Sequence, residues 1–539
     1  MRNLLPLKIL CTATAAFLAL AGHSHAVDYA WTGSTSTWSL NSNWNPATGF
    51  PNSNADNAIF TTNGDTTPTV STGTTIVKNL TYNGNTNFTI TGAGAATSTL
   101  RIDPNSSAGL FLITAFSGAW TNQSFSDVTL KIDNSSPPPS QQKFRMGAGK
   151  SITINSDAAL EIAAGNNILV ETNNGLGAGT LNINGGLTAG SATTLKADSG
   201  GVINLNFNAG TGLGNLGLLA TAGGIVNFAV GGDYGGNFAR TDINDGRFNL
   251  SSSGITVSNR TLTFNSGAAN TGVNGTLGAT YLSGTSTFSG NVVFADPNSL
   301  AKTNTIDVAT GATLALSGTF SGGDSSLLSV DKTGAGTLLL NRAAGNSFAA
   351  AGVTVSAGTL LITNTSNSAL GTVPITVAAG ATLGGTGTLD GVATINGIIA
   401  PGLSIGELTV GNDLTWNGAA AGGAATDWKF ELGAGNTADL LSLTGLGSDF
   451  LRDAGDPVFR FDFQASTATG TFKLVDWEGT TNFAFTDFSY TNLGGGHTGT
   501  FQFNGTQLEF IAVVPEPTTW ALITLGGVIT LTMRRRRFC

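Results

Sequence analysis

The stretch KTGAGTLLL, residues 332–340, decides the fold because the chain repeats it. Close or looser copies stand at residues 355–362 (VSAGTLLI), 377–391 (VAAGATLGGTGTLDG) and 308–318 (VATGATLALSG). They recur at roughly twenty-residue intervals, a repeat size at which one supersecondary unit stacks on the next. The repetition favours a parallel β-solenoid, in which apolar residues fill the interior, small residues form the corners, and Asn or Thr ladders stack along a face.

The rest of the central region, residues 75–416, consists of short alternating segments separated by Gly or Asn. In VINLNF, residues 202–207, the apolar Ile203, Leu205 and Phe207 alternate with asparagines. Period-two alternation is the signature of a strand with one buried face. About 20 residues per coil gives on the order of 17 coils and a rod on the order of 80 Å long. A long antiparallel β-sandwich array is the alternative architecture.

Composition excludes several classes of protein. Only 10% of the residues are charged, but 40% are hydrophobic, which argues for a folded chain rather than a disordered one. The net charge of −9 does not suit a nucleic-acid-binding surface. The two cysteines, Cys11 and Cys539, lie near the two ends, and His497 is the one histidine beyond the first 25 residues. We therefore predict no disulfide, no His- or Cys-based metal site and no cofactor.

The N-terminal segment, residues 1–26, reads as a secretory signal peptide. Arg2 and Lys8 form the positive region, an apolar run follows, and small residues precede the expected cleavage by signal peptidase after Ala26. A retained membrane anchor is the weaker interpretation, because the apolar run is short for a bilayer span. We expect an exported protein.

The next segment, residues 27–74, contains the tryptophans Trp31, Trp38 and Trp44. Clustered indoles can form a platform on which sugar rings stack. They can also plug the end of a solenoid, whose terminal coil would otherwise expose its core. We favour the cap.

Residues 417–513 are richer in aromatic and acidic residues than the solenoid, and we predict a compact antiparallel β-domain there. The complete prediction is an all-β chain: a right-handed parallel β-helix (β-solenoid) at residues 75–416, clearest at 332–416, a small antiparallel β-domain, and a C-terminal transmembrane helix within residues 514–539.

The solenoid also invites comparison with polysaccharide-cleaving enzymes, which need two carboxylates facing each other across a cleft. The nearest grouping of acids is RTDINDGR, where Asp242 and Asp245 stand between Arg240 and Arg247. It reads most simply as a charged turn. A calcium-binding glycine repeat would need its acid one position earlier than in GGTGTLD, residues 384–390, and would need tandem copies. We therefore predict no catalytic or metal-binding residue.

The C-terminal tail begins with Pro515, Glu516 and Pro517, and the two prolines stop a strand. A short apolar helix candidate follows at residues 521–533, and its length is marginal for crossing a bilayer. The basic residues at its end are Arg534, Arg535, Arg536 and Arg537. By the positive-inside rule this cluster stays in the cytoplasm, which suggests a temporary membrane anchor.

Two family resemblances follow from these residues. Residues 334–389 together with INGIIAPGLSIGELTVGNDLTW, residues 395–416, resemble the autotransporter-associated β-strand repeat, which forms β-helical regions of surface proteins. The tail, with its proline-glutamate-proline triplet, short helix and basic end, resembles the PEP-CTERM sorting signal. The second resemblance implies processing by an exosortase at the inner membrane of a Gram-negative bacterium that makes exopolysaccharide.

These resemblances imply a non-enzymatic structural or adhesin-like protein. It would pass transiently through the inner membrane and end at the cell surface, outer membrane or extracellular matrix. Exosortase, signal peptidase and exopolysaccharide are the implied partners, and nucleic acid is not. The alternatives are a β-helix polysaccharide lyase or glycosidase, and a carbohydrate-binding adhesin.

Overall fold

The computed structural model describes residues 27–61, 64–83, 86–105, 111–115, 122–134, 141–172, 178–207, 213, 216–234, 238–258, 260–264, 274–295, 301–323, 327–418, 424–453 and 458–515. The predicted signal peptide with its cleavage site at Ala26 lies outside these residues, and so does the tail from Glu516 onwards.

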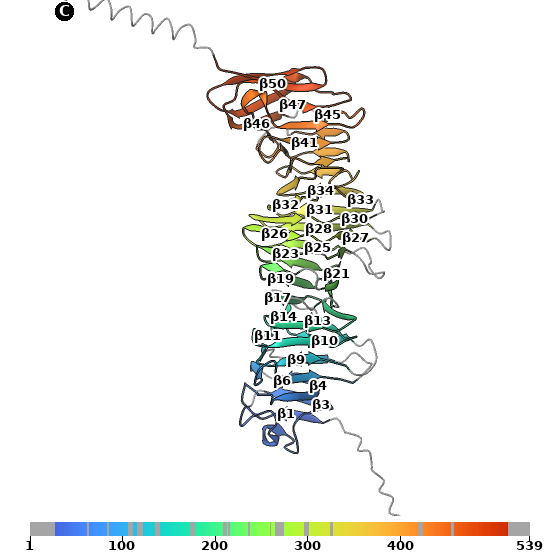
Figure 1. The fold of residues 1–539 in the computed structure, drawn as a ribbon, viewed down its shortest axis with the longest axis vertical. Coiled ribbons are helices and arrows are strands. Elements are labelled where there is room, and N and C mark those ends of the chain that lie inside the picture. The colour runs from blue at the N-terminus through green and yellow to red at the C-terminus, as the bar shows by residue number, and fades with distance from the viewer. Residues whose placement is uncertain are drawn as a thin grey trace, which may run out of the picture.

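The chain winds into a rod in which each turn stacks on the previous one (Figure 1). A typical turn contains three strands, β11 (Ser151–Ile154), β12 (Ala159–Ile162) and β13 (Asn167–Thr172). Each of them pairs in parallel with its counterpart in the following turn, which consists of β14 (Gly179–Ile183), β15 (Gly186–Ala189) and β16 (Thr193–Ala197). The predicted all-β parallel β-solenoid is confirmed.

One face of the rod is a single sheet of 15 strands within the described residues. Besides β11 and β14, its members are β5 (Phe88–Thr91), β8 (Gln123–Ser126), β17 (Gly201–Leu205), β19 (Ile225–Phe228), β22 (Arg247–Leu250), β25 (Thr276–Ala279), β28 (Lys302–Val308), β31 (Leu328–Thr333), β34 (Gly352–Val355), β36 (Ile375–Val377), β39 (Ala393–Ile395), β42 (Leu414–Trp416) and β45 (Phe450–Arg452).

This sheet counts about 15 turns, fewer than the 17 expected from a period of about 20 residues. The register advances by 18 residues from Ile375 to Ala393, but by 36 residues from Leu414 to Phe450. The turns are therefore longer on average than 20 residues, so a given length of chain makes fewer of them. At about 4.8 Å per turn the stack is about 70 Å long.

The second face carries β6 (Ser98–Ile102), β9 (Thr129–Ile132), β12 and β15 in the first half of the rod. Further along it is an eight-stranded sheet of β20 (Gly232–Asp233), β23 (Ile255–Val257), β26 (Gly284–Phe288), β29 (Ala312–Leu316), β32 (Thr337–Leu340), β35 (Thr359–Ile362), β37 (Thr382–Gly385) and β40 (Ile398–Pro401).

The sequence repeats form strands of this second face. The leucines of the four copies, Leu314, Leu338, Leu360 and Leu383, are register partners in β29, β32, β35 and β37, and all four are buried. The threonine before each leucine points outward and forms a parallel column. Each copy is thus one strand of consecutive turns.

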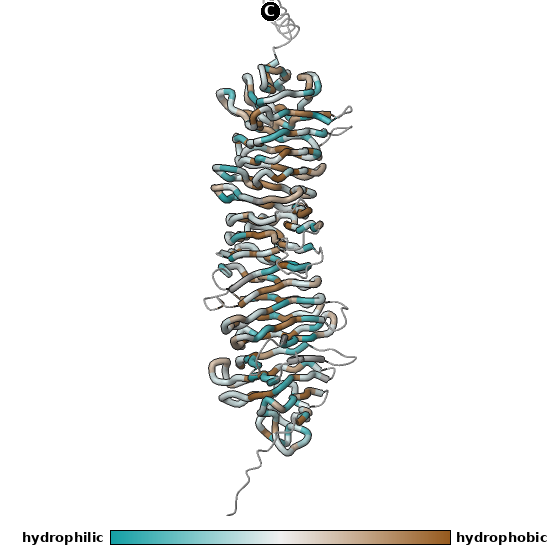
Figure 2. Tube along the Cα trace, turned by 90° about the vertical axis from the view of Figure 1, so that its right-hand side faces the viewer, coloured by the Kyte–Doolittle hydropathy of each residue, from teal (hydrophilic) through white to brown (hydrophobic). Residues whose placement is uncertain are grey.

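The third face consists of β7 (Phe111–Ala115), β10 (Gln141–Met146), β13, β16, β18 (Leu216–Thr221), β21 (Phe238–Asn244), β24 (Leu262–Phe264), β27 (Val292–Phe294), β30 (Phe320–Gly322) and β33 (Ser347–Phe348). At the N-terminal end β1 (Asp28–Trp31), β2 (Trp44–Asn45), β3 (Ser53–Thr61) and the long β4 (Gly73–Asn83) complete the stack. Apolar and polar segments alternate along the whole rod (Figure 2).

The N-terminal end of the core is closed by tryptophans. Trp31 and Trp38 each lie 4.9 Å from Trp44 between ring centroids, and all three indoles are at most 1% exposed. Their N–H groups donate to backbone carbonyl oxygens, so burial leaves no indole donor unsatisfied. This agrees with the capping interpretation and excludes a surface stacking platform in this conformation.

The C-terminal region differs from the antiparallel domain that the sequence suggested. Parallel pairing continues beyond Trp416. In one row β44 (Leu440–Leu443) follows β38 (Thr388–Leu389) and β41 (Glu407–Val410) and is followed by β47 (Gly470–Asp476); a second row consists of β43 (Trp428–Lys429), β46 (Phe459–Ser466) and β48 (Phe488–Leu493). Among the described strands of this region, β50 (Gln507–Val513) alone pairs antiparallel, with β47 and with β49 (Thr498–Phe503).

This sheet is therefore mixed rather than antiparallel, because the aromatic residues extend the solenoid core instead of starting a new one. Trp416 stacks on Trp428 with 3.7 Å between ring centroids. Within the described part of the chain, no helix is long and apolar enough to span a bilayer. The transmembrane helix predicted for the tail lies outside the described residues.

Candidate functional site

The residues of the predicted sorting signal are almost all beyond the described part of the chain. Pro515 is the last described residue, whereas Glu516, Pro517 and residues 534–537 are not described. Strand β50 ends at Val513, two residues before Pro515, which cannot donate to a β-ladder. The sorting signal itself stays a prediction.

The structure also locates the acids and the histidine for which the sequence predicted no functional role. Asp242 lies in β21 and is 3% exposed, whereas Asp245 occupies the turn after β21 with a φ of 60°. Burial raises the pKa of Asp245 above its ordinary value. Arg247 donates to Asp307, 2.8 Å away and two turns further along, instead of to either acid. His497 is half-buried in the turn between β48 and β49.

An asparagine ladder runs along the outer side of the 15-stranded sheet. Asn204 donates to Asn182 at 2.8 Å, Asn227 donates to Asn204 at 2.7 Å, and Asn249 donates to Asn227 at 2.9 Å. Each residue comes from a consecutive turn, so the ladder joins four turns through side-chain hydrogen bonds. The side-chain ladders expected for a solenoid are confirmed here.

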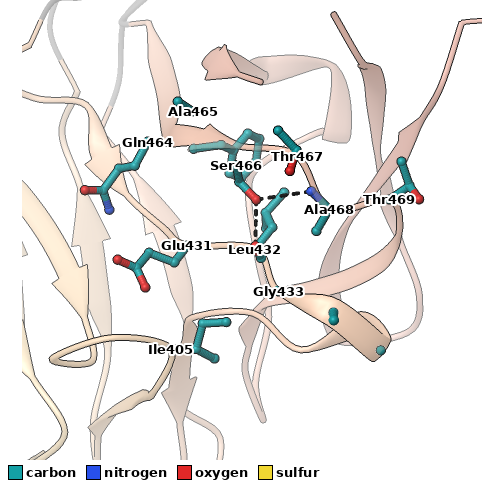
Figure 3. A pocket seen from close by; sticks show the side chains of 13 residues that line it. Ile405, Glu431, Leu432, Gly433, Gln464, Ala465, Ser466, Thr467, Ala468 and Thr469 are labelled. Carbon is teal, nitrogen blue, oxygen red and sulfur yellow. Dashed lines mark hydrogen bonds between the residues drawn. The ribbon is translucent and has the colours of Figure 1, made fainter. Parts of the chain in front are cut away.

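A pocket of about 760 Å³ lies near the C-terminal end of the rod, where the corners of three successive turns meet (Figure 3). Its first wall is Ile405, in the corner between β40 and β41. The second is a small hairpin from Glu431 to Asp439 that contains a 3₁₀ turn, η3 (Ala434–Asn436). The third is the corner at residues 463–469, where β46 passes into β47.

The hairpin is anchored by the buried carboxylate of Asp439. This carboxylate accepts hydrogen bonds from the amide of Glu431 at 2.7 Å and from the amide of Gly406, in the preceding turn, at 2.9 Å. Burial, with a smaller contribution from the nearby charge of Glu431, raises the pKa of Asp439 to about 7, although the two amide hydrogen bonds act in the opposite direction. Asp439 therefore fixes the backbone from which the Glu431 side chain projects.

The opposite wall is held in a sparsely populated backbone conformation. Gln464 and Ala465 have φ values of 51° and 62°, in the left-handed region, where the register of β46 shifts. Such residues cost about 1–2 kcal/mol each unless the surroundings hold them. Here the carboxylate of Asp462 accepts from the Gln464 amide at 2.9 Å, and the Ser466 hydroxyl donates to the Leu432 carbonyl at 2.6 Å.

This arrangement brings two polar side chains together. Figure 3 shows Glu431 and Gln464 projecting on the same side of the pocket from neighbouring turns. Among the described residues, neither the Glu431 carboxylate nor the Gln464 side-chain amide has a hydrogen-bond partner within the protein. Arg460, which lies in β46 like Gln464, forms a salt bridge with Asp427 at 2.7 Å.

Sequence reasoning missed this pocket because its walls come from three turns that are separated by about thirty residues in the sequence. The one signal available was the loss of alternation after Phe463, in QASTATG. A scan against protein-family models and a search of curated proteins find no match to this chain.

Proposed function

We propose that this protein is an exported, non-enzymatic structural rod of the cell surface or extracellular matrix, sorted by an exosortase through its C-terminal tail. The observation that carries the proposal is a single continuous core of stacked turns, closed by tryptophans at one end and by the antiparallel strands β49 and β50 of the mixed sheet at the other.

The side chains on the outside of the rod favour this role, because many of them form salt bridges or hydrogen bonds with the next turn. Lys131 pairs with Glu161 at 2.6 Å, and Arg145 pairs with Glu171 at 2.5 Å, each across one turn. Together with the asparagine ladder, these contacts join successive turns on the outside of the core. A stiff, extended surface suits a spacer or display function.

The closed ends favour a discrete rod. An open terminal turn would present unpaired backbone groups and core side chains to a second copy, and capping removes this route to end-to-end association. Strand β50 is the last described strand, so the C-terminal end of the rod would lie at the membrane while the sorting tail is attached. The tryptophan cap would lie at the far end.

The sorting step can be tested by changing the triplet alone. Replacing Pro515, Glu516 and Pro517 with alanine leaves the apolar segment and the arginines intact. We expect the full-length precursor to accumulate in the inner membrane, measured by cell fractionation with an antibody against the rod. Deleting residues 534–537 is the comparison, because it should disturb membrane orientation rather than recognition. Normal delivery of the triple-alanine variant would refute sorting through the triplet.

A further inference from the structure

We infer that the pocket formed by Ile405, Glu431 and Gln464 binds a non-anionic sugar ring, through hydroxyl groups that bridge the Glu431 carboxylate and the Gln464 amide. This activity goes beyond the proposed structural role, because it gives the rod a specific contact with a glycan.

The two side chains offer complementary hydrogen-bonding groups. An ionised carboxylate only accepts hydrogen bonds, whereas a side-chain amide both donates and accepts. A sugar hydroxyl also donates and accepts, so one hydroxyl or a vicinal pair can satisfy both residues at once. Because both groups lack a protein partner within the described residues, a ligand would not have to displace an existing contact.

The pocket is pre-organised for such a ligand. The buried Asp439 fixes the backbone at Glu431, and the Ser466 hydroxyl ties the left-handed corner at Gln464 to the hairpin through the Leu432 carbonyl at 2.6 Å. A ligand therefore does not have to order the backbone of these two walls, although the Glu431 and Gln464 side chains lose rotamer freedom when they bind it.

Size and charge narrow the ligand class. A volume of about 760 Å³ lies in the range of about 300–1,000 Å³ that is typical of small-molecule sites. Ile405 is 40% exposed and gives the pocket an apolar wall for the carbon face of a ring. Glu431 is the one charged side chain among the lining residues, so a uronic acid would be repelled and a neutral or amino sugar accepted.

The test is a glycan array that contains neutral, amino and uronic-acid oligosaccharides, probed with the full chain in a zwitterionic detergent that carries no sugar. Isothermal titration with the best hexose or amino-hexose oligosaccharide then gives the dissociation constant. We expect Glu431→Gln to weaken binding at least about tenfold, because a neutral amide oxygen accepts a weaker hydrogen bond than an ionised carboxylate. Gln464→Asn, which tolerates the left-handed backbone but shortens the side chain, should weaken binding similarly.

The matched control is Glu478→Gln, which removes an exposed carboxylate outside the pocket and should leave the affinity unchanged. Circular dichroism and thermal melting of each variant establish that the fold is retained. The inference is wrong if no neutral or amino sugar binds, if uronic acids bind best, if Glu431→Gln binds as tightly as the native chain, or if calcium alone occupies the site. Each result can be obtained in vitro, so it is independent of export and sorting.

Discussion

Replacing Asn227 by alanine removes the middle of the asparagine ladder and should destabilise the rod measurably. Asn227 makes two ladder hydrogen bonds, one of 2.7 Å to Asn204 and one of 2.9 Å from Asn249. A typical intramolecular hydrogen bond contributes about 0.5–1.5 kcal/mol net, so the upper limit is about 3 kcal/mol. Because the side chain is half-buried and water can replace part of the loss, we expect about 1–2 kcal/mol.

The assay is urea denaturation of the full chain, read as the change in the free energy of unfolding. A double-mutant cycle makes the test specific to the ladder. Asn204→Ala and Asn227→Ala remove opposite ends of one hydrogen bond, so their effects should differ from additivity by about 0.5–1.5 kcal/mol. Asn182→Ala and Asn249→Ala remove residues that are three turns apart, and these should add within about 0.5 kcal/mol.

The reasoning would be refuted if Asn227→Ala were neutral or stabilising, or if the adjacent and distant pairs showed the same coupling. In that case the side chains would only occupy the surface, and the stability of these turns would come from the core and the backbone ladder alone.

Three further predictions concern single positions. Gly278→Ala should cost about 1–2 kcal/mol in unfolding free energy, because its Cβ would meet the Asn249 side-chain oxygen and the Arg247 guanidinium, which donates to Asp307 across this turn; if Asn249→Ala and Arg247→Ala are made first, the extra cost should largely vanish. Lys332→Met should cost about 1–3 kcal/mol in urea denaturation, because Lys332 is 1% exposed and donates to three backbone carbonyls at 2.7–2.9 Å; an unchanged midpoint would contradict this. The pKa of Asp439 is raised to about 7, against 3.8 for the free group, so the stability that this group contributes is complete below pH 3.8 and is lost as the pH rises through 7. The melting temperature of the native chain should therefore fall between pH 5 and 8, and that of Asp439→Asn should fall less over the same range.

The architecture could be read from the sequence because it depends on local patterns. Ile203 and Leu205 alternate with asparagines in VINLNF, and both are buried while the asparagines face outward. The repeated GTL segments stack leucine on leucine because identical turns place identical residues in register. The number of turns was overestimated because some turns contain longer loops between their strands. The spacing of the clearest sequence repeats does not show these loops.

The end of the solenoid and the pocket could not be read in the same way. The segments after Trp416 look different in composition, yet Trp428 and Phe461 continue the same core, which only the parallel register reveals. Glu431 and Gln464 stand 33 positions apart and become neighbours because one turn of the solenoid separates them. The positive φ of Gln464, which orients that wall, carries no sequence signal, since glycine or asparagine is the usual residue there.

Thiol labelling tests most directly whether the mature rod is exported and processed. The two cysteines, Cys11 and Cys539, lie in the segments that signal peptidase and exosortase are expected to remove. Asn41→Cys places a new thiol on the exposed side of the tryptophan cap. A membrane-impermeant maleimide should label this variant in intact cells or shed matrix, whereas the native chain from the same fraction should carry no thiol even after denaturation. Labelling of Asn41→Cys only after lysis, or a native surface chain that still carries a thiol, would contradict the account.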